Sequence, residues 1–406
     1  MEIYMKTKLN LAVAAALLAG ASSANAGIMI PAGDWTLDIG GIVNTYYTRT
    51  TTSGDQVGLG GATDRPNGDS SSNITTGLLP NYLSVSGKTR QNDLDVGFTI
   101  SINPGSSTTQ AGIQNQPALG GNQENRQAFL TFGDKSWGSI KVGKDLGIYA
   151  SDAILNDMTL LGVGSGAGLL AGNTTTLGRI GTGFQYADWK SQVAYSSPNW
   201  NGFSFTAGVT QGWNALAGFG GAGTTSRGGG QPAFEAKASY EWAGDVGGKV
   251  WTSMMTQKVE FDNALGSDRA TAFDIGATVN LAGFGLTGYY GQGDGMGTTV
   301  QLNGGFDAAG RDRESDDWYV QATYALPGVG TKLGVSYGES TLEGNSGEAF
   351  DESQNSMWTV GAYHPLTKHL NLVAEYSVVE SELDDNVVAD IDGKSKTISL
   401  GAIMFF

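Results

Sequence analysis

The stretch "KSKTISLGAIMFF", from Lys394 to Phe406, ends the chain on a strand-like pattern. Apolar side chains occupy every second position up to the terminal carboxylate, at Ile398, Leu400, Ala402, Met404 and Phe406. A period of two indicates a β-strand with one apolar face. The last residues of most domains fray in water, so a strand that stays apolar to its final phenylalanine predicts a chain end that is paired and covered.

The opposite end of the sequence has the pattern of a secretory signal peptide over residues 1–26. Two lysines precede an apolar stretch, Leu11 to Ala19, and "GASSANA" then supplies a small-residue cleavage site. The apolar stretch is about half the length that a membrane-spanning helix needs, which argues against an anchor. We therefore expect residues 1–26 to be removed on export and residues 27–406 to form one domain.

The composition excludes several classes of function. The formal net charge is −16, and it becomes −17 once the signal peptide with Glu2, Lys6 and Lys8 is removed, whereas nucleic-acid binders are basic. Because the chain has no cysteine, disulfides, thiol catalysis and Cys-ligated metals are excluded. His364 and His369 are its only histidines, and no Ser-His-acid arrangement can be picked out. We expect no enzyme, no cofactor and no nucleic-acid partner.

Alternating segments recur along the whole chain. In "WTLDIGGIVNTYY" (Trp35 to Tyr47), Val43 and Tyr47 share one face, whereas Asn44 and Tyr46 lie on the other. The same period returns in "LDVGFTISI", "FDIGATVNL", "WYVQATYAL" and "LNLVAEYSV". With 63 glycines and no mature apolar run long enough for a transmembrane helix, this pattern predicts an all-β protein.

Connections and aromatic residues favour a membrane barrel over a soluble sandwich. In an outer-membrane barrel the apolar faces meet lipid and the polar faces line a wet lumen. Short turns such as "NLAGFG" and "HPLTKH" alternate with long polar loops at residues 50–78, 103–124, 212–232, 292–314 and 340–355. Aromatic residues gather where interfacial girdles would lie, at Tyr46, Tyr47, Tyr195, Tyr240, Trp242, Tyr289, Tyr290, Trp318, Tyr319, Trp358 and Tyr363. No sheet edge can stay unpaired in lipid, so the last strand must close on Trp35–Tyr47.

With these features, the sequence resembles the general trimeric porins of Gram-negative outer membranes. "NRQAFLTFGDKSWGSIKVGK" (Asn125 to Lys144) is similar to the porin hairpin that begins at an arginine. "AYSSPNWNGFSFTAGV" (Ala194 to Val209) and "YHPLTKHLNLVAEY" resemble two later blocks in the family's order. The terminal Phe406, with Met404 before it, resembles the signal that the outer-membrane assembly machinery reads. The resemblance implies an antiparallel barrel of about 16 strands, a homotrimer, and contacts with outer-membrane lipid and lipopolysaccharide.

The resemblance also implies an infolded loop that narrows the lumen. It would start after Lys144 and run toward residue 178 or 188, with Asp157 at the family's Asp-Met position. The Pro-Glu-Phe-Gly-Gly stretch of the enteric members is missing, because Leu160, Leu161 and Gly162 stand there. Asp152 is a further acidic residue within this loop.

A basic ladder on the wall would face that loop. Arg126 matches one ladder arginine, whereas two other ladder positions hold the uncharged Tyr82 and Gly41. The next basic position is open between two residues. Arg179 fits if "GRIGTGFQY" begins the strand, and Lys190 fits if the strand is "WKSQVAY". A further group shares the inward parity of its strands, namely Lys88, Arg90 and Lys141.

The expected function is a water-filled channel for passive diffusion of small hydrophilic solutes and ions. The negative charge and the uncharged ladder positions predict a mild preference for cations. The alternative is a substrate-specific channel for sugars, organic acids or phosphate. The acidic runs at residues 311–317 and 382–393 are either solvated or bind divalent ions that bridge lipopolysaccharide.

Overall fold

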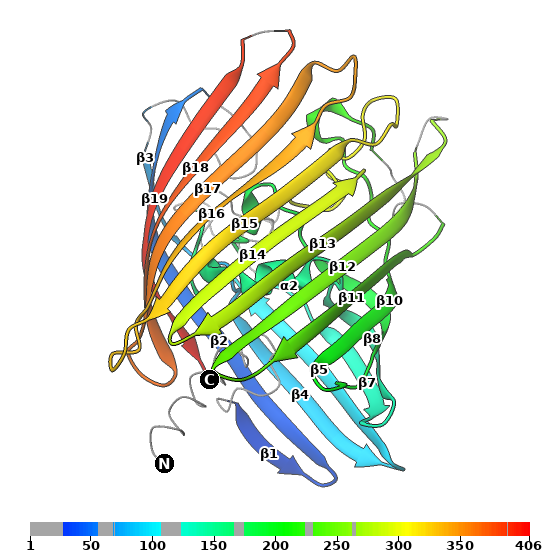
Figure 1. Ribbon diagram of the computed structural model, residues 1–406. Coiled ribbons are helices and arrows are strands. Elements are labelled where there is room, and N and C mark those ends of the chain that lie inside the picture. The colour runs from blue at the N-terminus through cyan, green and yellow to red at the C-terminus, as the bar shows by residue number, and fades with distance from the viewer. Residues whose placement is uncertain are drawn as a thin grey trace.

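The computed structural model describes residues 27–55, 68, 70–106, 123–165, 174–223, 230–261, 265–387 and 389–406. The expected signal peptide, residues 1–26, lies outside the described residues, as do parts of the long loops. Within the described part, the strands are tilted and form one barrel (Figure 1).

Sixteen strands form the ring, each antiparallel to its neighbours, as the sequence predicts. They are β2 (Trp35–Gly54), β4 (Tyr82–Gln91), β5 (Leu94–Pro104), β7 (Ala128–Asp134), β8 (Gly138–Leu146), β9 (Trp189–Ser196), β10 (Phe203–Thr210), β11 (Ala233–Trp242), β12 (Val246–Glu260), β13 (Ser267–Leu281), β14 (Phe284–Asp294), β15 (Glu314–Ala325), β16 (Lys332–Glu343), β17 (Phe350–Pro365), β18 (Leu370–Asp385) and β19 (Ile391–Phe405). Three shorter strands extend it, namely β1 (Ile28–Ala32), β3 (Ser70–Thr75) and β6 (Gln123–Glu124). Because β3 and β4 pair with different parts of the same edge of β2, they occupy one place in the ring.

The last strand closes the barrel on the first long strand, which confirms that prediction. β19 pairs with β2 from Gly393 opposite Gly54 to Phe405 opposite Ile42. Phe406 then exchanges two backbone hydrogen bonds with Gly41, at 2.8 and 3.1 Å. Below this point β1 takes over the same edge of β2, so the edge remains paired where β19 ends.

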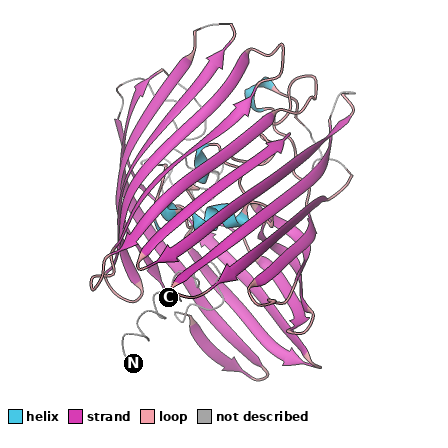
Figure 2. Ribbon diagram, in the orientation of Figure 1, coloured by secondary structure: helices cyan, strands magenta, loops and turns pink. Residues whose placement is uncertain are grey.

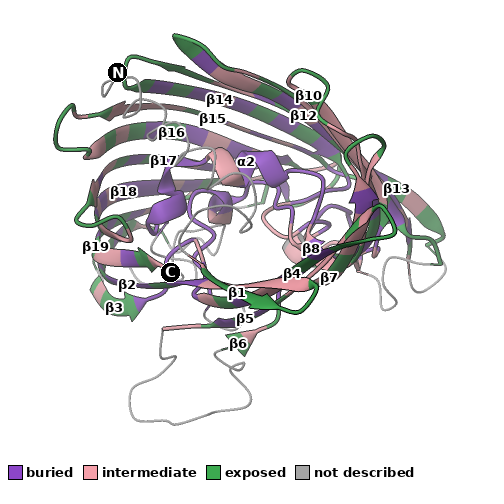
Figure 3. Ribbon diagram, turned by 90° about the horizontal axis from the view of Figure 1, so that it is seen from below, coloured by how far each residue is buried: buried purple, intermediate pink, exposed green. Residues whose placement is uncertain are grey.

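The two faces of the strands are assigned as the alternation predicts. On β2, Val43 is 51% exposed on the outside, whereas Asn44 inside is 2% exposed. Figure 3 shows exposed residues alternating with buried ones along the wall. The girdle expectation holds only in part, because four of the aromatic residues point inward and are buried: Tyr46, Tyr289, Tyr319 and Tyr363. They pack on segments that fold into the lumen.

Short turns and longer connections alternate, but one expected long loop is mostly strand. β16 continues to Glu343 and β17 begins at Phe350, so only residues 344–349 connect them. Most of residues 340–355 thus belong to strands of the wall rather than to a loop. Short connections do lie at the opposite end, as predicted, for example at residues 282–283 and 366–369.

The helical elements lie in connections, several of them inside the ring (Figure 2). Among the described residues they are α2 (Ser151–Asn156) and three short 3₁₀ turns, η2 (Met158–Leu161), η4 (Ile180–Thr182) and η5 (Gly218–Gly220). In the described part of the chain, no helix combines the length and the apolar character that a membrane span needs. Inward glycines make room for large inward side chains: a Cβ at Gly276 would overlap the indole of Trp251 on the neighbouring strand.

Candidate pore constriction

The segment between β8 and β9, here called the constriction loop, is described at residues 147–165 and 174–188 and lies off the wall. The start of this loop is fixed by Glu235, a buried residue on the inward face of β11. Its carboxylate accepts two successive backbone N–H groups, from Ile148 at 2.8 Å and from Tyr149 at 2.9 Å. Hydrogen bonds to an ionised acceptor are stronger than those between neutral groups. Glu235 therefore anchors the loop where it departs from the wall.

A second buried glutamate anchors the loop on another part of the wall. Glu375 on β18 accepts the N–H groups of Val163 at 2.7 Å and Gly164 at 2.9 Å, and the hydroxyl of Tyr363 at 2.6 Å. A Cβ at Gly162 would overlap this carboxylate, so the loop can approach it only with glycine there. β11 and β18 are seven places apart in the ring of sixteen. The loop is therefore held on nearly opposite sides of the lumen.

The predicted loop acid Asp152 lies in α2 and is paired with the wall. Its carboxylate accepts from Lys249 at 2.6 Å and from Lys237 at 3.2 Å. Burial raises the pKa of Asp152, but the two ammonium groups outweigh that effect and leave the pKa below its ordinary value. Next to it, the hydroxyl of Tyr319 donates to the carbonyl of Ala153 at 2.8 Å. Asp152 therefore holds α2 on β11 and β12, and the two lysines compensate its negative charge.

Asp157, the other predicted loop acid, is 3% exposed and turned into the loop. It caps η2: one carboxylate oxygen accepts the N–H of Thr159 at 2.9 Å, and the other accepts the hydroxyl of Thr159 at 2.6 Å. The N–H of Arg179 also approaches it, at 3.3 Å. These contacts satisfy loop donors that have no partner within a helix. The structure thus gives Asp157 a capping contact, and its role in the field across the pore stays a prediction.

The two alternatives for the basic wall residue are distinguished by the start of β9. The strand begins at Trp189, so Lys190, Gln192 and Ala194 face inward and are buried. "GRIGTGFQY" belongs to the constriction loop instead, with Arg179 immediately before η4. Lys190 is therefore the residue on the wall, where it pairs with Glu235 at 2.6 Å.

Arg179 pins the constriction loop to the opposite part of the wall. Its guanidinium donates to the carbonyl of Met357 on β17 at 2.8 Å and to the hydroxyl of Ser336 on β16 at 2.7 Å. The side chain is fully buried. Its contacts are those of an anchor between loop and wall.

Arg126, just before β7, lies between the wall and the loop. It donates to Glu124 at 2.8 Å and to the hydroxyl of Thr174 at 2.9 Å, and its guanidinium carbon lies 5.5 Å from the ring centroid of Trp189. Only 4% of Arg126 is exposed. Lys141 on β8 is more open, with 31% of its side chain exposed, and pairs with Asp145.

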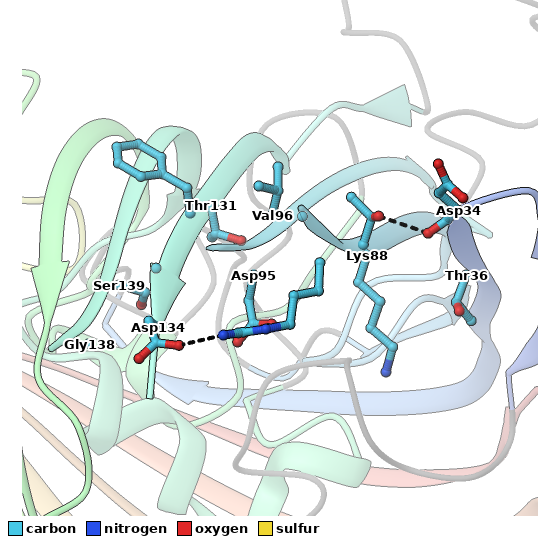
Figure 4. Close-up of a pocket in the computed structure, with 14 residues that line it drawn as sticks. Asp34, Thr36, Lys88, Asp95, Val96, Thr131, Asp134, Gly138 and Ser139 are labelled. Atoms are coloured by element: carbon cyan, nitrogen blue, oxygen red, sulfur yellow. Dashed lines mark hydrogen bonds and ion pairs between the residues drawn. The ribbon is translucent and has the colours of Figure 1, made fainter. Parts of the chain in front are cut away.

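Two of the inward basic residues lie at the short-turn end, in a cavity of about 620 Å³ (Figure 4). Arg90 pairs there with Asp95 at 2.9 Å and with Asp134 at 3.0 Å, while Lys88 lies opposite Thr36 of β2 in the ladder. Of the two uncharged positions predicted for the basic ladder, only one faces the lumen. Tyr82 faces inward opposite Ile42, but Gly41 pairs with the outward Leu83 and so does not face the lumen.

Sequence reasoning missed the strongest anchors, Glu235 and Glu375, and the two lysines that hold Asp152. A signal was present, because Glu235 and Lys237 stand two apart on β11 and Glu375 shares the inward parity of β18. A charged residue at inward parity can point to water or to a docked loop, and parity alone does not separate the two. Among the described residues, no group of three or more His, Cys, Asp or Glu could hold a metal ion.

A closed antiparallel barrel with a loop held across its lumen is the architecture of an outer-membrane channel. The family model described as Gram-negative porin matches residues 12–384. The chain belongs to that family, and it is an outer-membrane channel for passive diffusion rather than an enzyme. A search of curated proteins finds no match.

Solved structures share the fold at low identity. The outer membrane channel DcaP of Acinetobacter baumannii matches with a TM-score of 0.66 and 15% identity, over 93% of this chain and 99% of that one. OmpF of Salmonella typhi, solved with daunomycin, matches with a TM-score of 0.58 and 17% identity, over 93% and 100%. OmpT of Vibrio cholerae has a TM-score of 0.56 and 14% identity, over the same shares. At these identities the likeness concerns the fold alone.

Proposed function

We propose that the channel admits small hydrophilic solutes and ions without binding them, and that the constriction loop sets the width of the path. The observation that carries this proposal is the pair of anchors at Glu235 and Glu375, which hold the loop across the ring. Around the loop, Asp152, Asp157, Arg126, Arg179, Lys190 and Lys141 supply the charges of the constriction. A loop held by buried charge-assisted hydrogen bonds presents a fixed cross-section to solutes.

A mild cation preference is part of this proposal, and it originates mainly at the mouth. In the constriction loop Asp152 and Asp157 are buried, and Asp152 is paired with lysines, whereas carboxylates lie close to one another at the long-loop end. Burial and, next, the carboxylates of Asp268 and Asp294 raise the pKa of Asp312 there. Such crowding of negative charge lowers the potential energy of cations at the entrance.

The channel assembles as a homotrimer in this proposal. A trimer form of OmpT of Vibrio cholerae has the same fold, with a TM-score of 0.55. The outward face of the barrel meets outer-membrane lipid and lipopolysaccharide. The assembly machinery recognises the last strand through Phe406 and Met404.

Residues 1–26 direct export in this proposal, and they are removed as the chain is exported. The cleaved chain then starts at Gly27, which lies beside the carboxylate of Asp38. The new α-ammonium group gains a counter-charge at that position, so the proposed cleavage point is compatible with the folded barrel.

Planar-bilayer recording tests the channel and its selectivity. We expect ohmic single-channel currents and a reversal potential in a salt gradient that favours cations. The preference should weaken as salt rises, because the Debye length falls from about 10 Å at 0.1 M to about 3 Å at 1 M. A conductance that saturates and is blocked by one sugar, organic acid or phosphate would instead establish the substrate-specific alternative.

A further inference from the structure

Part of the barrel interior is built as a dry core, although the lumen of a porin is expected to be wet. Most inward positions on the long-loop halves of β12 and β13 carry apolar residues, namely Met255, Val259, Ala270 and Ala272, while Gln257 between them hydrogen-bonds the backbone of Trp213. These apolar residues pack against the buried side chains of Met296, Leu302 and Phe306. All three come from residues 295–313, the connection between β14 and β15. This connection is therefore folded into the barrel and covers the wall beneath it.

The same connection reaches across the lumen to a distant strand. Gln301 accepts a hydrogen bond at 2.6 Å from the ammonium group of Lys190 on β9, and the two residues are 2% and 0% exposed. β14 and β9 are five places apart in the ring. At about 4.8 Å between neighbouring strands, the connection bridges about 24 Å of wall.

The connection also lies directly on the constriction loop. The amide nitrogen of Gln301 donates to the carbonyl of Tyr186 at 2.8 Å. Thr299 exchanges two hydrogen bonds with Gly183: its N–H donates to the carbonyl at 3.2 Å, and its hydroxyl accepts the N–H at 3.1 Å. The two infolded segments thus share a hydrogen-bonded seam inside the barrel.

A buried arginine holds the other end of the connection. Arg313 forms a bidentate ion pair with Glu348 in the connection between β16 and β17, and one of its two contacts is 2.8 Å long. It also donates to the carbonyl of Gly304 at 2.7 Å, and its side chain is fully buried. A bidentate arginine–carboxylate pair fixes geometry as well as charge. Residues 295–313 are therefore held in their middle by Gln301 and at their last residue by Arg313.

We propose that residues 295–313 form a second constriction element, joined to the first at Lys190, so that the solute path is set by two infolded segments. This inference rests on the channel function described above and specifies which segments shape the path. The bridge covers the inner wall at β12 and β13, and solutes pass on the side where inward residues such as Ser86, Thr131 and Lys141 stay partly exposed.

The junction explains why the two elements act together. Lys190 binds Gln301 of the second element and Glu235, and Glu235 binds the first residues of the constriction loop. All three side chains are buried. Loss of either partner leaves a buried charged group without part of its hydrogen bonding, which is unfavourable. Loosening the bridge therefore also loosens the start of the constriction loop.

Two variants test the proposal. Gln301→Leu keeps the size of the side chain but removes both of its hydrogen bonds, and replacement of residues 298–303 by a Gly-Ser linker of equal length removes the bridge. For both we expect higher single-channel conductance, and faster swelling of proteoliposomes in trisaccharide than in wild type. The matched control is Asn386→Leu, which removes an exposed amide contact between the β18–β19 connection and Asp351 at the start of β17, and should leave both readings unchanged.

Heat-modifiable migration on gels shows whether each variant has folded. Folded variants with wild-type conductance and wild-type trisaccharide swelling would overturn the proposal while leaving the channel function intact. A wild-type protein that carries no current in either assay would overturn the channel function itself. If Gln301→Leu fails to fold, the linker variant decides the question, because its polar segment leaves room for water to hydrogen-bond Lys190 where Gln301 stood.

Discussion

Replacing Glu375 by alanine should release the constriction loop from β18 at Val163 and Gly164. The carboxylate accepts three hydrogen bonds, from Val163, Gly164 and the hydroxyl of Tyr363. Two of these bonds, from Val163 and Gly164, hold the loop, whereas Tyr363 lies on the neighbouring wall strand. A hydrogen bond to a charged group contributes about 1.5–3 kcal/mol, so the loss of the two loop bonds removes about 3 kcal/mol even at the low end of that range. Since about 1.4 kcal/mol is a tenfold change in an equilibrium constant, the undocked population of this part of the loop should rise about 10²-fold.

Single-channel recording can detect that population. The wild-type channel should show a quiet open level, whereas Glu375→Ala should show added open-channel noise and visits to levels of higher conductance. Glu375→Gln should lie between the two, because its amide oxygen can still accept from the loop but carries no charge. The rank order of the three proteins thus separates the positioning of the loop from the charge in the lumen.

Glu380→Ala is the matched control for this experiment. Glu380 lies on the same strand, but 44% of its side chain is exposed and it pairs with Lys394. Its removal should leave the current unchanged. If folded Glu375→Ala gave the quiet current and the conductance of wild type, the loop would be held by its apolar contacts, and the reasoning from hydrogen bonds would be refuted.

Three further predictions concern other parts of the molecule. Arg126→Ala removes a buried cation beside the loop, and it should enlarge the conductance and shift the reversal potential in a salt gradient toward cations; an unchanged reversal potential would make Arg126 an ordinary wall residue. Deletion of Phe406 should lower the amount of heat-modifiable protein in the outer membrane while export continues, and normal yields would count against its role as a signal. The hydrogen bond from Arg313 lowers the pKa of Glu348, so the ion pair should be fully formed above the ordinary pKa of glutamate and should weaken as pH falls through the lowered pKa. Hydrogen exchange of residues 344–350, measured against pH, tests this; protection that does not change with pH would contradict the role of the ion pair.

The barrel could be predicted from the sequence because its physical requirements are local and periodic. Lipid on one face and polar groups on the other impose a period of two on every strand, as at Val43 and Asn44. The need to pair every edge fixes the partner of the last strand, and β19 indeed closes on β2. Parity also placed Lys190 correctly once the start of its strand was known.

The interior could not be predicted in the same way, because no period governs it. Asp157 was singled out as a charge at the constriction, yet its carboxylate accepts both donors of Thr159 two residues later. That contact depends on the local turn, which an acidic residue in a glycine-rich segment does not reveal. Likewise, Tyr319 and Tyr363 resemble girdle residues in the sequence. In the structure Tyr319 donates to the loop carbonyl of Ala153, and Tyr363 belongs to an apolar cluster with Met158 and Leu161 of the loop.

The anchors follow from a requirement of the backbone itself. A segment folded into a barrel leaves its N–H and C=O groups without a sheet partner, and buried groups of this kind must be paired. The wall therefore supplies side chains for them: Glu235 and Glu375 accept N–H groups, and Tyr319 donates to a carbonyl. A polar residue at an inward position in such a chain is thus as compatible with a docked loop as with water. Exposure separates the two, and at these three residues, each no more than 4% exposed, the wall binds protein rather than solvent.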